Sequence, residues 1–578
     1  MSSRVRSGVS PRRPPPMAPM GGLRYGLMLA IVLVGLGLLV GRVVILHGVD
    51  RPFLQGQGDA RTLRTDPIPA HRGMISDRNG EPLAISTPVV TLWANPQDVP
   101  EDPIQRLQLA RALGMEPDDL DARLARFASR EFMFLRRQLT PQAAQRVLDL
   151  RIPGVYRQDE YKRYYPAGEV TAQLLGVTNV DDVGQEGLEL AYQFYLAGEP
   201  GQRRVLKDRR GRLVRDLEVL REARPGGELT LSIDQRLQYM AYRELKAAVE
   251  SHRADAGSAV VLDVKTGEVL ALVNQPSYNP NDRSELKTDA LRNRALTDLF
   301  EPGSTMKPLT VAAAMMSGQY TRDSIIDTSP GYIRVGGASI KDHRNYGKLD
   351  LTGIITKSSN VGVTRLALEM PHDTVRNLLH NVGLGRDTGT GFPGERTGVL
   401  PFLAERQRVE RATMSYGYGL STTLLQLAQA YVPLAADGIM RPATLLKQTQ
   451  TPAGTRVLPP GVGPQVLDML ETVISAKGTG RRAAVEGYRV GGKTGTVHKA
   501  SGGGYAEDKY VSVFAGVAPL TNPRLVIAVM VDNPKGQEYY GGLVAAPIFS
   551  RIAAGSLRLL NVPPDKWPEP PSTHVAMQ

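Results

Sequence analysis

Three short strings in the second half of the chain combine residue types that could carry out covalent acyl transfer. They are Ser304-Thr305-Met306-Lys307, Ser358-Ser359-Asn360 and Lys493-Thr494-Gly495-Thr496, which read S-x-x-K, S-x-N and K-T-G in this order. A serine hydroxyl is a weak nucleophile that needs a neighbouring base. A second hydroxyl can relay a proton, and a lysine beside threonine hydroxyls can hold a carboxylate. Together the strings predict a serine acyl-transfer enzyme whose substrate is a peptide.

Each pattern also occurs a second time in the chain, so the pattern alone does not identify the site. The second matches are Lys265-Thr266-Gly267, Ser277-Tyr278-Asn279 and Ser284-Glu285-Leu286-Lys287, in the reverse order. Residues 265–267 lie between the apolar runs 259–262 and 269–273, which predicts a hairpin turn. Ser284 follows a polar stretch that is typical of a loop. Because a short motif needs its structural context, we favour the downstream set.

The sequence around Ser304 predicts a nucleophile at the start of a helix. The dipeptide Pro302-Gly303 interrupts the chain, and good helix formers follow in residues 309–316. A proline is tolerated only in the first turn of a helix, so Pro308 requires the helix to begin close to Ser304. Lys307 then lies on the same face as Ser304, where the helix dipole favours negative charge. The alternative is a serine N-cap before a core helix.

Lys307 is the predicted base, because no G-x-S-x-G string surrounds Ser304 and the chain has only eight histidines. An ordinary lysine has a pKa of about 10.4, which must fall to about 7–8 for a base that works near neutral pH. Burial and a second cation, for which Lys493 is the candidate, would lower the pKa of Lys307. Ser358 would pass a proton to the leaving amine. Asn360 would bind the substrate amide or hold Lys307.

The third string is expected to be an edge strand, because glycines and apolar residues precede it. An edge strand pairs with an extended peptide, and Gly495 would let the substrate approach the backbone. Thr494 and Thr496 would bind a terminal carboxylate, with positive charge from Lys493. The N–H groups of Ser304 and Thr496 would form the oxyanion hole. A simple turn at the third string is the alternative.

The N-terminal region predicts a membrane anchor. Residues 1–24 carry five arginines, no acid and several prolines, which predicts a disordered basic tail. Residues 25–46 are almost entirely apolar and would span about 33 Å as a helix, the thickness of a bilayer core. The arginines place the N-terminus in the cytoplasm and the rest of the chain in the periplasm, at a cell inner membrane. A cleavable signal peptide should be shorter and end in a small-residue site. A core helix and a basic arm for nucleic acid are weaker alternatives.

Composition excludes several classes of chemistry. The chain has 578 residues, a net charge of +12 and no cysteine, which excludes disulfides, thiol redox chemistry and cysteine metal sites. Its histidines form no H-E-x-x-H cluster, so we predict neither a metal nor another cofactor. A chain of this length should fold into two to four domains.

Residues 47–230 are rich in charge and chain breakers and contain no plausible catalytic set, so we expect a pedestal there. Residues 77–80 read as a turn between extended pieces, and residues 101–127 have leucines and alanines at helical spacing. The pedestal would be an elongated α/β structure.

The catalytic domain is expected over residues 231–560, before a loose tail at 561–578. A helix is predicted from 235 to 251 and another near 422–436, with strands at 510–517 and 525–531 besides the 259–273 hairpin. Strands at both ends of the domain with helices between them favour an α+β fold, an antiparallel sheet with helices on both sides.

Further strings resemble those of the class B penicillin-binding proteins, over nearly all of the chain after residue 25. These strings are Arg72-Gly73-Met74-Ile75-Ser76-Asp77-Arg78-Asn79-Gly80, Tyr165-Pro166-Ala167-Gly168, Gly184-Gln185-Glu186-Gly187, Glu301-Pro302-Gly303-Ser304, Ser415-Tyr416-Gly417-Tyr418-Gly419, Tyr540-Gly541-Gly542 and Ala546-Pro547. The resemblance implies a penicillin-binding/β-lactamase-like transpeptidase domain after a class B dimerisation-type domain. Length and the single anchor look most like the division-specific septal D,D-transpeptidases of Gram-negative bacteria.

The resemblance also implies a reaction and partners. Ser304 would attack the penultimate D-Ala carbonyl of a peptidoglycan stem peptide, release the last D-Ala and transfer the acyl group to an amine on a neighbouring stem. β-Lactam antibiotics would acylate the same serine. The implied partners are a membrane glycan polymerase and other division proteins, and no nucleic acid.

Four alternatives remain open at this point. Elongation-specific transpeptidases share the three strings, and a D,D-carboxypeptidase would use water as the acceptor. A β-lactam sensor usually has several membrane helices, whereas one is predicted here. An inactive scaffold is disfavoured because every motif residue is present.

Overall fold

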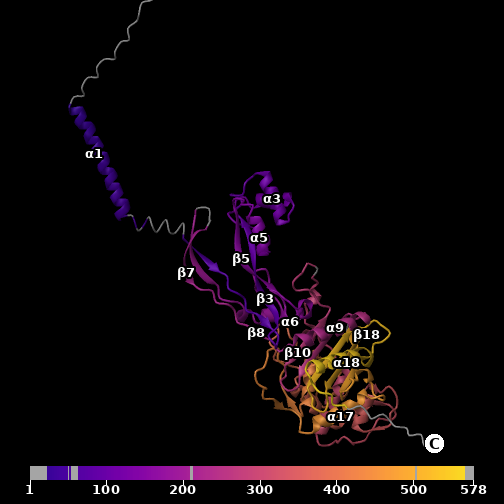
Figure 1. Ribbon diagram of the computed structural model, residues 1–578. Helices are drawn as coiled ribbons and strands as arrows, with labels where there is room; N and C mark the ends of the chain where they lie inside the picture. The colour runs from indigo at the N-terminus through magenta and orange to yellow at the C-terminus, as the bar shows by residue number, and fades with distance from the viewer. Residues whose placement is uncertain are drawn as a thin grey trace, which may run out of the picture. The chain divides into compact units, whose positions relative to one another are not determined.

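A computed structural model describes residues 22–49, 51, 53, 63–208, 213–284, 286–501 and 504–566 (Figure 1). The predicted basic tail lies outside the described residues up to residue 21, and the predicted C-terminal tail lies outside them from residue 567. The chain forms two compact units. One comprises Met1–Ile68 and Pro200–Glu222, and the other comprises Pro69–Glu199 and Ala223–Gln578.

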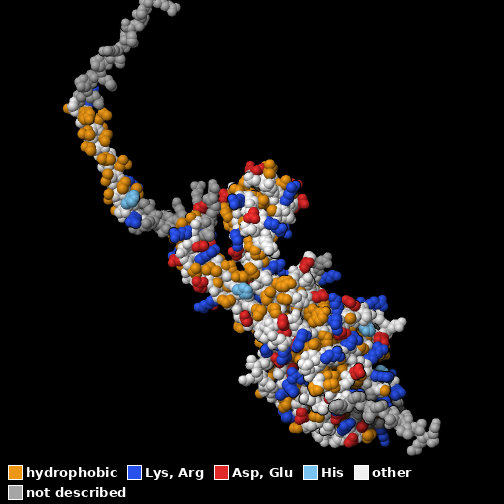
Figure 2. Space-filling model, viewed as in Figure 1, with side chains coloured by type: hydrophobic (Ala, Val, Ile, Leu, Met, Phe, Trp, Pro, Cys, Tyr) orange, Lys and Arg blue, Asp and Glu red, His pale blue; other side chains and the backbone are white. Residues whose placement is uncertain are grey.

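The first unit contains the predicted membrane helix and a small sheet. Helix α1 (Gly22–Val44) continues through a π-helical turn (Ile45–Val49), and none of its residues is buried. Apolar side chains cover it along its length (Figure 2). Its 28 residues are long and apolar enough to cross a bilayer. Strands β1 (Leu63–Ile68), β6 (Gly201–Lys207) and β7 (Leu213–Arg221) form an antiparallel sheet in the order β1-β6-β7.

The N-terminal part of the second unit is a second sheet covered by helices. Its strands are β2 (Ile75–Ser76), β3 (Pro82–Ala94), β4 (Met133–Leu139), β5 (Val155–Tyr164) and β8 (Leu229–Thr230), in the order β4-β3-β2-β8 with β5 paired to β3. Its helices are α3 (Pro103–Leu113), α4 (Pro117–Arg126) and α5 (Pro141–Leu148). The predicted helical region is therefore two helices. They separate because Gly114 closes α3 with a φ of 65° and Pro117 begins α4.

A buried ion-pair network of Arg72, Arg163 and Glu189 joins three segments that are far apart in the sequence. The carboxylate of Glu189 is fully buried between Arg72 (2.7 Å) and Arg163 (2.6 Å). Glu189 belongs to the short helix α7 (Gly187–Ala191), which follows α6 (Ala172–Leu175) and precedes α8 (Gln193–Leu196). The network thus fixes three distant segments against one another.

The catalytic part is an antiparallel sheet with helices on both faces, as predicted. Strands β9 (Ala256–Asp263), β10 (Val269–Gln275), β17 (Gly491–Ser501), β18 (Gly504–Ala518) and β19 (Leu525–Asp532) lie in the order β10-β9-β19-β18-β17. Helices α9 (Gln235–Ser251) and α18 (Gly541–Leu559) pack on one face (Figure 1). Helices α11 (Lys307–Met316), α16 (Leu424–Ala435) and α17 (Val462–Ile474) pack on the other.

Short helices and strands connect these longer elements. The helices are the 3-10 turns η2 (Gly168–Val170), η3 (Thr288–Leu291), η4 (Gly303–Met306) and η5 (Arg481–Ala483) with α10 (Arg294–Thr297), α12 (Leu351–Lys357), α13 (Asn360–Glu369), α14 (Thr374–Asn381) and α15 (Arg408–Met414). The strands are β11 (Ile326–Asp327), β12 (Tyr332–Val335), β13 (Ala338–Lys341), β14 (Lys348–Leu349), β15 (Ile439–Met440) and β16 (Thr455–Arg456).

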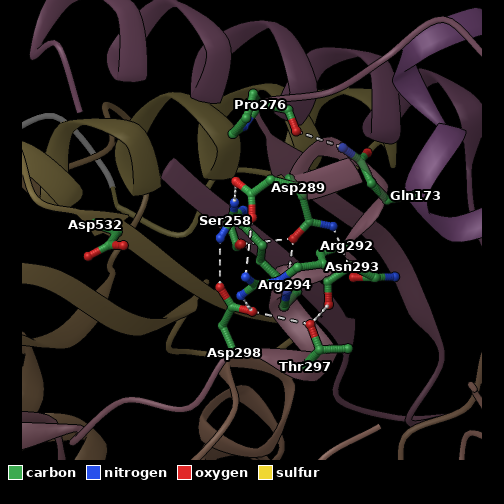
Figure 3. Close-up of polar contacts among 12 residues, drawn as sticks. Gln173, Ser258, Pro276, Asp289, Arg292, Asn293, Arg294, Thr297, Asp298 and Asp532 are labelled. Carbon is green, nitrogen blue, oxygen red and sulfur yellow. Dashed lines mark hydrogen bonds and ion pairs between the residues drawn. The ribbon is translucent and has the colours of Figure 1, made fainter. Parts of the chain in front are cut away.

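The segment that leads into the Ser304 turn is anchored by a charged cluster (Figure 3). The nearly buried Arg294 pairs with both Asp289 and Asp298, the latter at 2.9 Å. The neighbouring Asn293 accepts a 2.9 Å hydrogen bond from the side chain of Asn274 in β10. These contacts tie the segment to the sheet at Asn293, ten residues before the turn begins at Gly303.

Candidate active site

Ser304 lies in the tight turn η4, directly before helix α11. Pro308 occupies the first turn of α11, so the helix starts where that proline predicts, and the turn η4 directly before it has 3-10 geometry. Gly303 has a φ of +56°, and a Cβ there would lie 2.5 Å from Val497 of β17. Only a residue without a side chain lets the turn approach the strand so closely.

Lys307 is fully buried beneath this turn. Its Nζ donates to the Ser358 carbonyl (2.6 Å), to Ser358 Oγ (3.0 Å) and to Asn360 Oδ1 (2.7 Å). Burial lowers the pKa of Lys307 well below its ordinary value. The charge of Lys493 lowers it further, and the carboxylate of Asp342 partly opposes both effects. The direction and the two causes agree with the sequence-based expectation.

The S-x-N string forms a sharp link between two helices. Ser358 ends α12 in the left-handed conformation, with φ 57° and ψ 44°. Ser359 caps α13, where its hydroxyl accepts a 2.9 Å hydrogen bond from the Gly362 N–H. This turn of the backbone directs both Ser358 and Asn360 toward Lys307. The left-handed conformation is strained at Ser358 because this residue is not glycine.

Asp342 holds this link in place, and the motifs gave no signal for it. Its Oδ2 accepts a hydrogen bond from Ser359 Oγ (2.6 Å), and its Oδ1 accepts from the N–H groups of Asn360 (2.5 Å) and Val361 (3.0 Å). The adjacent Lys341 carbonyl accepts from the Asn360 side-chain amide (2.9 Å). A carboxylate at the N-terminus of α13 is favourable for the helix dipole as well.

The K-T-G string lies on β17, the edge strand of the sheet, as predicted. Lys493 is fully buried, and burial lowers its pKa to about 7. The hydroxyl of Thr494 is 2.9 Å from that of Thr479. A Cβ at Gly495 would lie 3.0 Å from the carbonyl oxygen of Pro302, so this glycine also admits the Ser304 turn.

A helix N-terminus adds to the positive potential beside these hydroxyls. The N–H of Gly541, the first residue of the 19-residue α18, donates to Thr496 Oγ1 at 2.9 Å. Gly542 lines the same cleft as Thr494 and Thr496. The N-terminal end of a long helix favours anions, so this part of the cleft suits a carboxylate.

The cleft that contains these groups has a volume of about 600 Å³. Ser304, Ser358, Asn360, Thr494 and Thr496 line it, with Lys307 and Lys493 buried beneath. An aromatic wall, which the motifs did not reveal, completes it. Tyr539 stacks on both Tyr510 (centroids 4.2 Å apart) and Tyr540 (4.4 Å). The other lining residues are Lys341, Asp342, His343, Tyr418, Thr479, His498, Gly542 and Leu543.

The second set of motif matches lies away from the cleft. Thr266, in the β9–β10 turn, donates to Glu268 (2.9 Å), and Ser277 donates to the Glu169 carbonyl (2.7 Å). Ser284 donates to its neighbour Asp282 (2.8 Å). These hydroxyls serve local structure. In the described ranges no group of three or more His, Cys, Asp or Glu side chains could hold a metal ion.

Comparison with known proteins agrees with this geometry. Residues 257–554 match the penicillin-binding protein transpeptidase domain, and residues 67–231 match the penicillin-binding protein dimerisation domain. The chain is 42% identical over 560 residues to the peptidoglycan D,D-transpeptidase FtsI of Escherichia coli (strain K12), with 96% of this chain and 95% of FtsI covered. It is 40% identical over 573 residues to the probable peptidoglycan D,D-transpeptidase PenA of Neisseria gonorrhoeae, with 97% and 98% covered.

A solved structure supports the same fold. The apo transpeptidase domain of Burkholderia pseudomallei penicillin-binding protein 3 is 46% identical, with a TM-score of 0.54, and the match covers 58% of this chain and 98% of that domain. The two matched domains, the near-complete coverage of the relatives and the N-terminal apolar helix all agree. The chain therefore belongs to the class B penicillin-binding proteins, as a serine D,D-transpeptidase of the septal, FtsI type.

Proposed function

We propose that the chain cross-links peptidoglycan stem peptides of the division septum through an acyl-enzyme on Ser304. Neutral Lys307 takes the proton of the Ser304 hydroxyl as its oxygen attacks the penultimate D-Ala carbonyl. The N–H groups of Ser304 and Thr496 stabilise the oxyanion. Ser358 passes a proton to the amine of the departing D-Ala, and Asn360 keeps Lys307 in place.

The substrate lies along the edge of β17 in this proposal. Its terminal carboxylate meets Thr494 and Thr496, with positive charge from Lys493 and from the N-terminus of α18. Gly495 leaves the backbone of this edge strand accessible, so that an extended peptide can pair with it. β-Lactams carry a carboxylate and a reactive carbonyl, so they take the same position.

One observation carries the assignment of the base. The buried Lys307 Nζ lies within hydrogen-bond distance of both Ser358 Oγ (3.0 Å) and Asn360 Oδ1 (2.7 Å), and its pKa is lowered. This joins the first two motifs in one proton path, which is what a serine nucleophile without a histidine requires.

The test of the nucleophile is covalent labelling with a fluorescent penicillin. Ser304→Ala should abolish labelling, and Ser284→Ala, which alters the second S-x-x-K match, should leave it intact. Labelling that persists in Ser304→Ala and disappears in Ser284→Ala would show that Ser284 is the nucleophile and would contradict the proposal.

The amine acceptor distinguishes a transpeptidase from a D,D-carboxypeptidase. A full-length chain in membranes that releases D-Ala but never joins nascent glycan strands would favour the carboxypeptidase. Depletion in the source bacterium separates the two transpeptidase roles. Filamentation is expected for a septal enzyme, and rounding would indicate an elongation role.

The remaining parts have proposed roles as well. Helix α1 anchors the chain in the cell inner membrane with its basic N-terminus in the cytoplasm. Residues 47–230 act as the periplasmic pedestal of the catalytic domain at 231–560. The anchor and the pedestal meet a membrane glycan polymerase and other division proteins. Protease protection of the N-terminal tail in spheroplasts tests the orientation, since a cytoplasmic tail resists digestion from outside.

A further inference from the structure

The position of the acceptor amine follows from the chemistry of the first half-reaction. Transfer of the acyl group to an amine is the reverse of acylation by an amide. The incoming amine must therefore occupy the place that the leaving amine vacated. In the proposed reaction this place is beside Ser358 Oγ, which lies 3.0 Å from Lys307 Nζ. The remainder of the acceptor should therefore contact the wall of the cleft that lies next to Ser358.

The end of β13 and the short loop after it form that wall. The Lys341 carbonyl accepts a hydrogen bond from the Asn360 side chain (2.9 Å), and Asp342 binds the first N–H groups of α13. Lys341 and His343 both line the cleft. The loop is thus fixed to the S-x-N link, and its two outer side chains project beside it.

Among the described residues, no side chain of opposite charge pairs with Lys341 or His343. Lys341 and His343 are exposed, and within the described part of the chain neither forms an ion pair or a side-chain hydrogen bond. The carboxylate of Asp342 between them is committed to Ser359, Asn360 and Val361. The wall therefore offers an unpaired ammonium group and an imidazole to a ligand, which fits an anion.

We propose that Lys341 and His343 bind a carboxylate of the acceptor peptide. This inference rests on the proposed function. The acceptor is a second copy of the stem peptide, so it carries a terminal carboxylate at some distance from its reacting amine. The amine nitrogen bonds to the ester carbon of the acyl-enzyme, the bond from that carbon to Ser304 Oγ breaks, and the amine proton passes through Ser358 to Ser304 Oγ. Lys341 and His343 bind the acceptor and take no part in these bonds.

The test compares two acceptors that differ in one group. Full-length protein in detergent is acylated by a thioester donor. The acceptor amine is either Nα-acetyl-lysyl-D-alanine or its C-terminal amide. For each acceptor, the ratio of acyl transfer to hydrolysis is measured. The wild type should prefer the carboxylate acceptor. Lys341→Ala and His343→Ala should each lower that preference by roughly two- to fivefold, the range for exposed ion pairs. Penicillin acylation is measured in the same proteins, so that a loss of acceptor preference is distinguished from a loss of acylation.

The same loop supplies a matched control. Arg344 is exposed beside the other two, but it lies over the Tyr346 ring (5.3 Å to the centroid) and does not line the cleft. Arg344→Ala should leave the preference intact. The subsite would be overturned if the preference were unchanged in Lys341→Ala and His343→Ala. It would also be overturned if Arg344→Ala lost the preference to the same extent. A wild type that is not acylated by penicillin at all would instead overturn the proposed function, and this inference with it.

Discussion

Lys307 Nζ lies 2.7 Å from Asn360 Oδ1, so the proposed base in the first motif is held by the amide of the second. The two residues begin different helices, α11 and α13, whose N-terminal ends meet beneath the cleft. Because an amide oxygen accepts hydrogen bonds without carrying charge, Asn360 orients the amine and does not favour its ammonium form as a carboxylate would. This explains how a well-ordered lysine keeps a lowered pKa.

Replacing Lys307 by alanine should abolish most acylation and leave the fold intact. A general base contributes about 10²–10⁴-fold to a rate, so penicillin acylation should fall by that order. Stopped-flow acylation and circular dichroism measure the two properties separately. Normal acylation by a folded Lys307→Ala protein would assign the base to another group.

Asp342→Asn should move the acid limb of the acylation pH profile to lower pH. Asp342 raises the pKa of Lys307, so its charge favours the protonated, inactive form of the base. Without that charge the pKa of Lys307 falls, and protonation stops acylation only at a more acidic pH. The variant should also be slower overall, because an amide cannot accept all three hydrogen bonds from the α13 N-terminus.

The control for this prediction is Asp323→Asn, which alters an exposed carboxylate outside the cleft. Its acid limb should coincide with that of the wild type. If the acylation rate of Asp342→Asn falls while its acid limb stays at the wild-type pH, Asp342 has a purely structural role.

Binding of a β-lactam should make the protein take up protons near pH 8. Burial gives Lys493 a pKa of about 7, so at pH 8 the group is mostly neutral. A bound carboxylate favours the ammonium form and raises this pKa, so a proton enters with the ligand. Calorimetry of Ser304→Ala in buffers of different ionisation enthalpy measures the uptake without acylation.

At pH 5.5 Lys493 is already protonated, so the uptake should vanish there. Adding Lys493→Gln to Ser304→Ala should remove it at pH 8 also. Equal proton uptake at both pH values, or in both proteins, would place the ligand carboxylate elsewhere.

Glu189→Gln should destabilise the pedestal part of the second unit by about 3–5 kcal/mol, the usual cost of breaking a buried ion pair. The change removes the carboxylate that forms an ion pair with both buried arginines, Arg72 and Arg163. Urea unfolding followed by circular dichroism measures it. The exposed Glu186, three residues earlier, supplies the control variant Glu186→Gln, which should unfold like the wild type. Similar midpoints for both variants would contradict the prediction.

The parts of the fold that depend on local pattern were predictable. The helix Gln235–Ser251, the edge strand with Lys493 and the break before Ser304 all follow from residue periodicity and the position of Pro308. The chemistry of the motif residues also led to the proposal of Lys307 as the base, and its burial was expected from that proposal. These features depend on neighbours within a few residues, which a single sequence contains.

The features that were missed depend on contacts across the fold. Asp342 reaches the α13 N-terminus from 17 residues away, and the stack of Tyr510 and Tyr539 joins β18 to the segment before α18. Neither has a local pattern, because an aspartate in a polar loop and a tyrosine in a strand are both common. The helical region predicted at 101–127 is confirmed, and the boundary between its two helices could have been predicted from Gly114 and Pro117, which interrupt the helical pattern.

The close approach of Gly303 to Val497 means that the reactive serine is assembled from two separate layers, the helical layer that carries Ser304 and the edge strand β17. Neither layer alone contains both the nucleophile and the anion-binding hydroxyls. A penicillin label therefore counts molecules in which the sheet and the helical layer have docked. The same antibiotic that inactivates the protein thus serves as a stoichiometric reporter of its correctly folded fraction.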